Sequence, residues 1–343
     1  MHACLAAILL AAGFGIGDAG VGDRSDNSAD LSNAAARRGL ELFDGSHYRD
    51  AIAAFSDAIV LEPTAAVYCF RAACHYELGE SGRAMQDLNR CLAFEKAADH
   101  DIQAAAFWMR SNLKYVQDDR QGALNDINAA LAIAPNTERF LFLRAVYSGQ
   151  LFDYQTAIDD LTRAIEIAPA EVEYYSYRAR CWETLGELEL AISDIAKVVE
   201  LRPDAASPLA WRAWAYLRTG KPQVAITDLE QAVSLDPDNW NYEVALARAC
   251  VFAEKDRTPE NFQRAIALIE SACEQTKWQN APVLQQLAQV VGASGDWRRA
   301  VEIQQQVVDL AVEMDKQRAG VVLWKLQQRT CMLDDLGGID VNR

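Results

Sequence analysis

Residues 172–205 read VEYYSYRARCWETLGELELAISDIAKVVELRPDA. Two stretches of helix-forming residues flank a turn at Gly186, and Pro203 follows the second stretch. A proline lacks the backbone N–H that a continuing helix needs, so the second helix is predicted to end there. The stretch therefore predicts a helical hairpin, in which the small residue Ala191 allows two helix backbones to approach closely.

This alanine belongs to a series that runs along most of the chain. Its members are Ala51, Ala84, Ala123, Ala157, Ala191, Ala225, Ala265 and Ala300. A period near 34 residues is typical of one helix–turn–helix unit per repeat. Each unit is too small to bury its own apolar stripe, so the units must stack to form one continuous core. The fold class is predicted to be all-α, an α-solenoid of about eight repeats.

The residues around these alanines resemble the tetratricopeptide repeat. The signature places of residues 172–205 are filled in order by Tyr175, Ala179, Trp182, Gly186, Ala191, Ile195, Val198 and Pro203. The next unit matches with Ala213, Tyr216, Gly220, Ala225, Leu229, Ala232 and Pro237. The closing proline recurs as Pro63, Pro135, Pro169, Pro203 and Pro237. The resemblance implies a right-handed superhelix, a scaffold for protein binding, and no catalysis.

The domain organisation follows from this register. Residues 34–314 form the predicted array, residues 20–33 an acidic linker before it, residues 315–336 a capping helix after it, and residues 337–343 a tail. Two units carry extra residues, near Asp99–Gln103 and Asp256–Glu260, which are expected to lengthen turns.

The first residues resemble a secretory signal peptide. The apolar run from Cys4 to Ile16 is too short to span a bilayer, and small residues follow it up to Ala19. Residues 1–19 are therefore predicted to be a signal peptide, and the protein to be exported, periplasmic or secreted. No Lys or Arg precedes the run, and a cytoplasmic protein is the alternative.

The composition and net charge of the chain limit the kinds of partner that it is expected to bind. The chain has 33 basic and 49 acidic residues, a net charge of −16, which repels nucleic acid and anionic membranes. A protein or peptide partner is expected, without membrane insertion beyond the signal segment. No phosphate-binding loop, dinucleotide fingerprint, nucleophile elbow or zinc-protease motif occurs, so no catalytic residue, metal or cofactor is predicted. His47, His75 and His100 are expected to lack partners that would give them catalytic roles.

The cysteines are predicted to have a structural role. Cys69, Cys74, Cys91, Cys181, Cys250, Cys273 and Cys331 mostly replace small apolar residues of other units, so they are predicted to be buried thiols.

One pair of charged residues recurs from repeat to repeat. The seventh place of units two to six is an arginine, and an aspartate follows it by 16 residues. The five predicted pairs are Arg71–Asp87, Arg110–Asp126, Arg144–Asp160, Arg178–Asp194 and Arg212–Asp228. The last two units replace both partners by apolar residues, Leu246 with Leu268 and Leu287 with Ile303.

The resemblance also implies where a partner binds. In proteins similar to this one, fixed places on the first helix of each repeat line the concave face. Here those places hold Tyr76, Trp108, Asn112, Tyr115, Arg139, Phe142, Arg180, Trp214, Arg218, Arg248 and Phe252. Rings and arginines of this kind suit a peptide or a helix of a partner. Packing between neighbouring helices is the alternative role, above all for Trp108 and Trp214. Assembly of an exported or envelope complex through the convex face or the ends is the alternative function.

Overall fold

The structure is a computed structural model that describes residues 27–94, 100–252, 257–310 and 313–327. Its contacts divide the chain into two compact units, unit 1 up to Cys181 and unit 2 from Trp182 onward. Unit 1 holds α2 (Asn27–Asp44), α3 (Tyr48–Leu61), α4 (Ala65–Glu77), α5 (Ser81–Leu92), α6 (His100–Val116), α7 (Arg120–Ile133), α8 (Glu138–Gln150) and α9 (Tyr154–Ile167). The division falls within α10 (Val172–Leu185).

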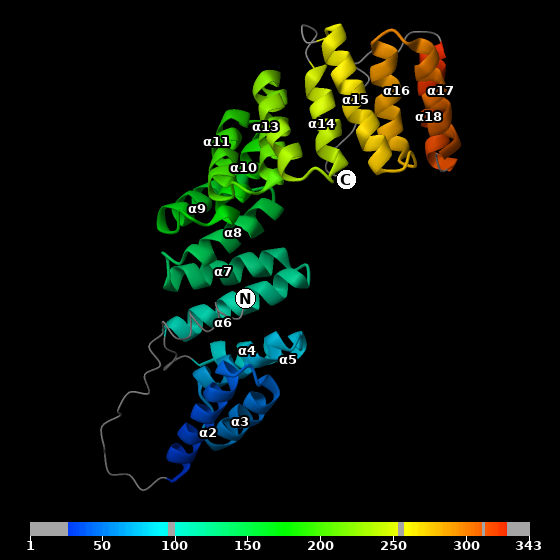
Figure 1. Cartoon of the computed structure of the whole chain (residues 1–343). Coiled ribbons are helices and arrows are strands. Elements are labelled where there is room, and N and C mark those ends of the chain that lie inside the picture. Colours follow the sequence, from blue (N-terminus) through cyan, green and yellow to red (C-terminus); the bar gives the residue numbers. More distant parts are fainter. Residues whose placement is uncertain (1–26, 95–99, 253–256, 311–312, 328–343) are drawn as a thin grey trace. The chain divides into compact units, whose positions relative to one another are not determined.

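Unit 2 continues the same alternation of helices. It holds α11 (Leu188–Leu201), α12 (Ala206–Arg218), α13 (Pro222–Leu235), α14 (Trp240–Cys250), α15 (Pro259–Gln275), α16 (Ala281–Ala293), α17 (Trp297–Leu310) and α18 (Glu313–Gln327). Within each unit, consecutive helices pair as hairpins that stack side by side (Figure 1). The described residues contain no strand, so the predicted all-α solenoid of about eight helix pairs is confirmed.

The helices begin and end where the repeat register predicts. In the five units with a closing proline, the second helix ends two residues before it, as α9 does at Ile167 before Pro169. The residue before a proline is pushed toward an extended backbone, which stops the helix. All eight alanines of the series have no exposed surface, as close packing of the helix backbones requires.

Three boundaries differ from the sequence prediction. Helix α2 begins at Asn27, so the second part of the predicted linker is helical, and the buried Ser32 donates a hydrogen bond to the carbonyl of Ala58. The extra residues of the two irregular units belong at least partly to helices, since α6 and α15 each have 17 residues. The start of α15 is stabilised by Thr258, whose side chain accepts a hydrogen bond from the backbone N–H of Asn261, and by Pro259 in the first turn.

The end of the array carries a helix at the predicted place. Helix α18 packs on α17, and the amide of Gln304 donates a hydrogen bond to the carbonyl of Ala319. Residues 328–336 of the predicted capping helix and the tail lie outside the described residues. The predicted signal peptide and the first part of the linker lie outside them as well.

Charge pairs join the two helices of a repeat. Four of the five predicted pairs are bidentate, as in Arg144, whose Nε and Nη2 each lie 2.6 Å from an oxygen of Asp160. The others are Arg71–Asp87, Arg110–Asp126 and Arg212–Asp228. Arg178 and Asp194 lie on opposite sides of the division between the units, so their pairing stays a prediction. The apolar replacements, such as Leu246 with Leu268, lie in the core of unit 2.

The third repeat adds a second cation to its pair. Lys114 Nζ lies 2.8 Å from Asp126, which also binds Arg110. Burial alone raises the pKa of the Asp126 carboxyl, but hydrogen bonds from Arg110 and Lys114 outweigh burial and leave that pKa below its usual value. The aspartate is thus held ionised between the two helices.

The arginines also link successive repeats, a role that the sequence did not reveal. Arg110 donates through Nη1 to the amide oxygen of Asn89, which lies on the second helix of the preceding repeat. The equivalent acceptors for Arg71, Arg144 and Arg178 are Ser56, Asn128 and Thr162. Each of these arginines therefore ties its repeat to the one before.

Unit 2 achieves the same link with different residues. There the acceptor place is a glutamate, and an arginine on the next second helix pairs with it, as Arg264 does with Glu230 and Arg299 with Glu270. The two repeats that lost the Arg–Asp pair thus keep an ionic link to their predecessors.

The described cysteines are buried thiols, as predicted. Cys69, Cys74, Cys91, Cys181, Cys250 and Cys273 are buried and unbridged. Burial raises the pKa of Cys74 to about 12 and that of Cys181 to about 11. Cys331 lies outside the described residues.

Candidate partner-binding faces of the A helices

The candidate residues all lie on or beside the first helix of a repeat, here called the A helix. Unit 1 carries seven of them on α4, α6, α8 and α10, and unit 2 carries four on or just after α12 and α14. Because equivalent places in stacked repeats share a face, the residues of each unit form a row. Their exposure differs widely, and exposure decides which of them a partner reaches.

Trp108 is a packing residue. Only 4% of its surface is exposed, and its ring stacks on Phe140 of the next A helix at 6.5 Å. The alternative that the sequence left open for this residue, packing between neighbouring A helices, therefore describes it. Its indole Nε1 is buried and has no hydrogen-bond partner among the described residues.

Asn112 and Tyr115 form a cluster with a residue that the sequence analysis missed, Tyr147. The Tyr147 hydroxyl donates to Asn112 Oδ1 at 3.1 Å, and its ring stacks on Tyr115 at 4.9 Å. Asn112 Nδ2 donates to the carbonyl of Trp108 at 3.2 Å. Burial raises the pKa of Tyr147 to about 12. Both ends of the Asn112 amide are therefore engaged within the protein.

The next A helices continue the aromatic row of unit 1. Phe142 lies 5.2 Å from the ring of Tyr174 and 6.0 Å from that of Tyr177, both on α10. The Tyr177 hydroxyl donates to the carbonyl of Val146, and burial raises its pKa to about 12. Arg139 and Arg180 are exposed beside these rings, whereas Tyr76 at the start of the row is half-buried.

Unit 2 carries the second row. Trp214 is half-buried, and the exposed guanidinium of Arg218 lies 4.7 Å from the centre of its ring. This arrangement is a cation–π contact at the surface, and it presents an aromatic ring and a charge together. Phe252, just after α14, is 49% exposed. Arg248 is half-buried, and burial lowers the pKa of its guanidinium.

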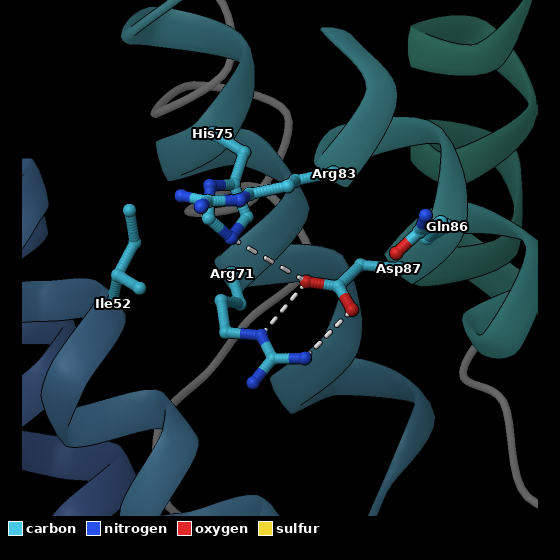
Figure 2. Close-up of a pocket in the computed structure, with 6 residues that line it drawn as sticks. All are labelled: Ile52, Arg71, His75, Arg83, Gln86 and Asp87. Atoms are coloured by element: carbon cyan, nitrogen blue, oxygen red, sulfur yellow. Dashed lines mark hydrogen bonds and ion pairs between the residues drawn. The ribbon is translucent and has the colours of Figure 1, made fainter. Parts of the chain in front are cut away.

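One pocket of about 320 Å³ lies elsewhere, between α3, α4 and α5. It is lined by Ile52, Arg71, His75, Arg83, Gln86 and Asp87 (Figure 2). His75 Nδ1 lies 2.7 Å from Glu80 Oε2, and its Nε2 lies 4.0 Å from Asp87 Oδ2. The expectation that the histidines lack carboxylate partners is therefore wrong for His75, because Glu80, the N-cap residue of α5, folds back onto the end of α4.

The charged groups of this pocket are already paired with one another. Asp87 binds Arg71, and Glu80 accepts hydrogen bonds from both His75 and Arg83, which lower the pKa of Glu80. The network joins two helices of one repeat and presents no thiol or hydroxyl nucleophile among the lining residues. Its geometry supports the packing of α4 on α5.

Two family models match parts of the repeat array. A family model described as tetratricopeptide repeat matches residues 36–101 and 149–206, and a second one of the same description matches residues 206–239. The chain is a tetratricopeptide repeat protein. In this tetratricopeptide repeat protein, the matched segments include α4, α10 and α12, which carry Tyr76, Arg180, Trp214 and Arg218 of the two rows.

Three solved structures are similar to this tetratricopeptide repeat protein. The C-terminal part of a TPR repeat-containing protein from Cytophaga hutchinsonii has a TM-score of 0.61 at 19% identity, over 73% of this chain and 98% of its own. A tetratricopeptide repeat protein from Parabacteroides merdae has a TM-score of 0.49 at 17% identity, over 75% and 98%. YrrB, a TPR protein with an unusual peptide-binding site, has a TM-score of 0.49 at 22% identity, over 55% and 95%. The first of them supports the repeat fold.

The described part of this tetratricopeptide repeat protein has neither a cluster of metal ligands nor a membrane-spanning helix. No three His, Cys, Asp or Glu side chains there converge as metal ligands. None of its helices combines the length and the apolar character that crossing a bilayer requires.

Proposed function

We propose that this tetratricopeptide repeat protein is a scaffold that binds a peptide or a helix of a partner protein on the A-helix rows. The observation that carries the proposal is the contact of Arg218 with Trp214. Phe252 is exposed and holds the place of Arg218 in the next repeat. In a chain of net charge −16, arginines and rings gathered on one set of helices favour contact with a partner, because they supply both apolar area and anion contacts.

The test compares two variants with the wild-type protein. The double variant Trp214→Ala with Arg218→Ala removes both the ring and the charge of this cation–π contact, and neither residue is fully buried. Phe152→Asn with Val116→Ser alters the turn edge of unit 1 and is the matched control. Cross-linked partners are recovered from cells that make the protein and are identified by mass spectrometry. The proposal predicts loss of partners in the first variant alone; unchanged recovery in that variant, with helical content preserved, would sink it.

The control variant also tests the second candidate, assembly of a larger complex through the ends or edges. Phe152, in the turn after α8, is 79% exposed, and Val116, the last residue of α6, is 80% exposed. Phe152 also has a positive φ of 66°, a conformation that bulky residues rarely adopt. An exposed ring held at such a turn favours contact with another protein. Loss of partners in the Phe152 and Val116 variant alone would support this candidate.

We further propose that the protein is exported, on the strength of the apolar run from Cys4 to Ile16 and the small residues after it. Sequencing the N-terminus of the protein purified from its native source tests this. A start near Gly20 supports export, whereas a start at Met1 or His2 supports the cytoplasmic alternative.

A further inference from the structure

Two cysteine thiols meet between the helices of the second repeat. Cys69 lies on α4 and Cys91 on α5, and neither residue has any exposed surface. Their thiols are hydrogen-bonded to each other. The residues before them in the sequence show the same register of the two helices, because Arg90 Nη1 donates to the hydroxyl of Tyr68 at 3.4 Å. Two thiols in contact on facing helices have the proximity that a disulfide bond requires.

The other cysteine of α4 does not share this arrangement. Cys74 lies five residues after Cys69, which is about 140° around a helix of 3.6 residues per turn, so the two thiols leave α4 on different faces. On α5, the place of Cys91 is held in other repeats by alanines such as Ala58 and Ala130. Packing at that place therefore needs only a small residue, and the thiol of Cys91 adds a reactivity that alanine lacks.

The folded structure protects the reduced pair. The hydrogen bond with Cys91, and then burial, raise the pKa of the Cys69 thiol well above its usual value. The Cys69 thiol also lies 3.9 Å from the carbonyl oxygen of Ile102, so the first turn of α6 covers it. A thiolate is the species that attacks a disulfide, and the attack needs access to the sulfur. Exchange with an external disulfide must therefore take place before the second repeat has folded.

We infer that Cys69 and Cys91 form a disulfide bond when the chain folds in the presence of a disulfide oxidant, such as oxidised glutathione. One cysteine thiolate attacks the disulfide of the oxidant and releases one glutathione thiol, which leaves a mixed disulfide on the protein. The second cysteine attacks the protein sulfur of that mixed disulfide and releases the other glutathione. The two protein thiols lose two electrons and two protons, and the oxidant is reduced to two thiols.

The bond joins α4 covalently to α5. Cys91 follows Cys69 by 22 residues, and closing a loop of this length removes conformations from the unfolded chain. Helix α4 carries Tyr76, so the bond also holds the start of the unit 1 row in place. The proposed export places the chain in an oxidising compartment, where disulfide bonds persist. The pairing itself depends on the positions of the two thiols and not on a partner or on export.

Refolding of the full chain tests the pairing. The reduced, urea-unfolded protein is refolded in a glutathione redox buffer or in dithiothreitol, the remaining thiols are alkylated, and trypsin is added without a reductant. Trypsin separates the three cysteines of this repeat: residues 50–71 carry Cys69, residues 72–83 carry Cys74 and residues 91–96 carry Cys91. Mass spectrometry should find the first and third peptides linked in the glutathione sample and separate in the dithiothreitol sample.

Two variants serve as controls. Cys74→Ala keeps both thiols and should give the same linked peptide as wild type. Cys91→Ala introduces the residue that other repeats have at this place, so it should fold and give no linked peptide. Amide hydrogen exchange of α4 and α5 should be at least about tenfold slower in oxidised than in reduced wild type, and equal in the two states of Cys91→Ala.

Absence of the linked peptide from refolded wild type would overturn the inference, and so would linked peptides that join the cysteines of the chain at random. Linkage of residues 72–83 to residues 91–96 in place of the expected pair would also overturn it. The refolding is carried out on purified protein, so its result is independent of partner recovery and of the N-terminal residue found in the native source. Failure of the proposed function and failure of the pairing are therefore distinguished.

Discussion

Gly220 adopts a left-handed backbone conformation, with φ of +71°, at the turn between α12 and α13. No atom lies within 4 Å of the place where a Cβ would stand, so a substitution there tests the backbone alone. We expect Gly220→Ala to destabilise the protein by about 1–2 kcal/mol, because a side chain disfavours positive φ. Gly320→Ala is the control, since Gly320 lies inside α18 with equally open space, and it should stabilise by roughly 0.5–1 kcal/mol. Urea unfolding of both variants measures the two effects, and shifts of the same sign would contradict the argument.

The thiols give a second prediction for single residues. Burial raises the pKa of Cys74 to about 12 and the pKa of Cys181 and Cys273 to about 11, and all three are shielded from solvent. A raised pKa lowers the thiolate fraction, so at pH 8 these cysteines should be alkylated roughly 100-fold or more slowly than a free cysteine. Peptide mass spectrometry after timed alkylation checks the rates, and the unfolded protein is the control. Rapid labelling in the folded state would show that the thiols are accessible.

Within a repeat, the Arg144–Asp160 pair joins two helices. Asp160 is buried and both of its oxygens bind Arg144, so Asp160→Leu leaves a partly buried cation unpaired. We expect a loss of about 3–5 kcal/mol for that single change and recovery of much of it in Arg144→Leu with Asp160→Leu. The repeat with Leu246 and Leu268 is a natural example of an apolar pair at these two places. Chemical unfolding of the two variants measures the difference; equal losses would mean that the charges do not act as a pair.

The helices and their pairing could be predicted because they depend on residues that recur at one register. The helix end before Pro169 follows from the local backbone rule for proline, and the close packing at the alanine series follows from its fixed period. The role of Trp108 could not be predicted in that way. The same place on an A helix is exposed or buried depending on the side chains of the neighbouring repeat, and here Phe140 of the next A helix stacks on the Trp108 ring. The Glu80 partner of His75 and the Tyr147 hydrogen bond to Asn112 depend on side-chain geometry that a repeat pattern does not contain.

On the scale of the whole molecule, each unit is held by links between neighbouring repeats. In unit 1 these links are arginine hydrogen bonds such as Arg110 to Asn89, and in unit 2 they are ion pairs such as Arg264 with Glu230. Stability in such an array is approximately a sum of repeat terms and nearest-neighbour terms. A local defect should therefore loosen its own repeat and the adjacent ones and leave distant repeats unchanged.

Hydrogen exchange of the Asp228→Leu variant tests this locality. Loss of the carboxylate leaves Arg212 unpaired between α12 and α13, so amide exchange should accelerate in these helices and in α14. Exchange in α4 to α7 of unit 1 should match that of wild type. The Arg212→Leu with Asp228→Leu variant, measured in parallel, should return α12 and α13 toward wild-type protection. Uniform acceleration along the chain would mean that the two units unfold as one cooperative body, since only global opening exposes distant helices to the same extent.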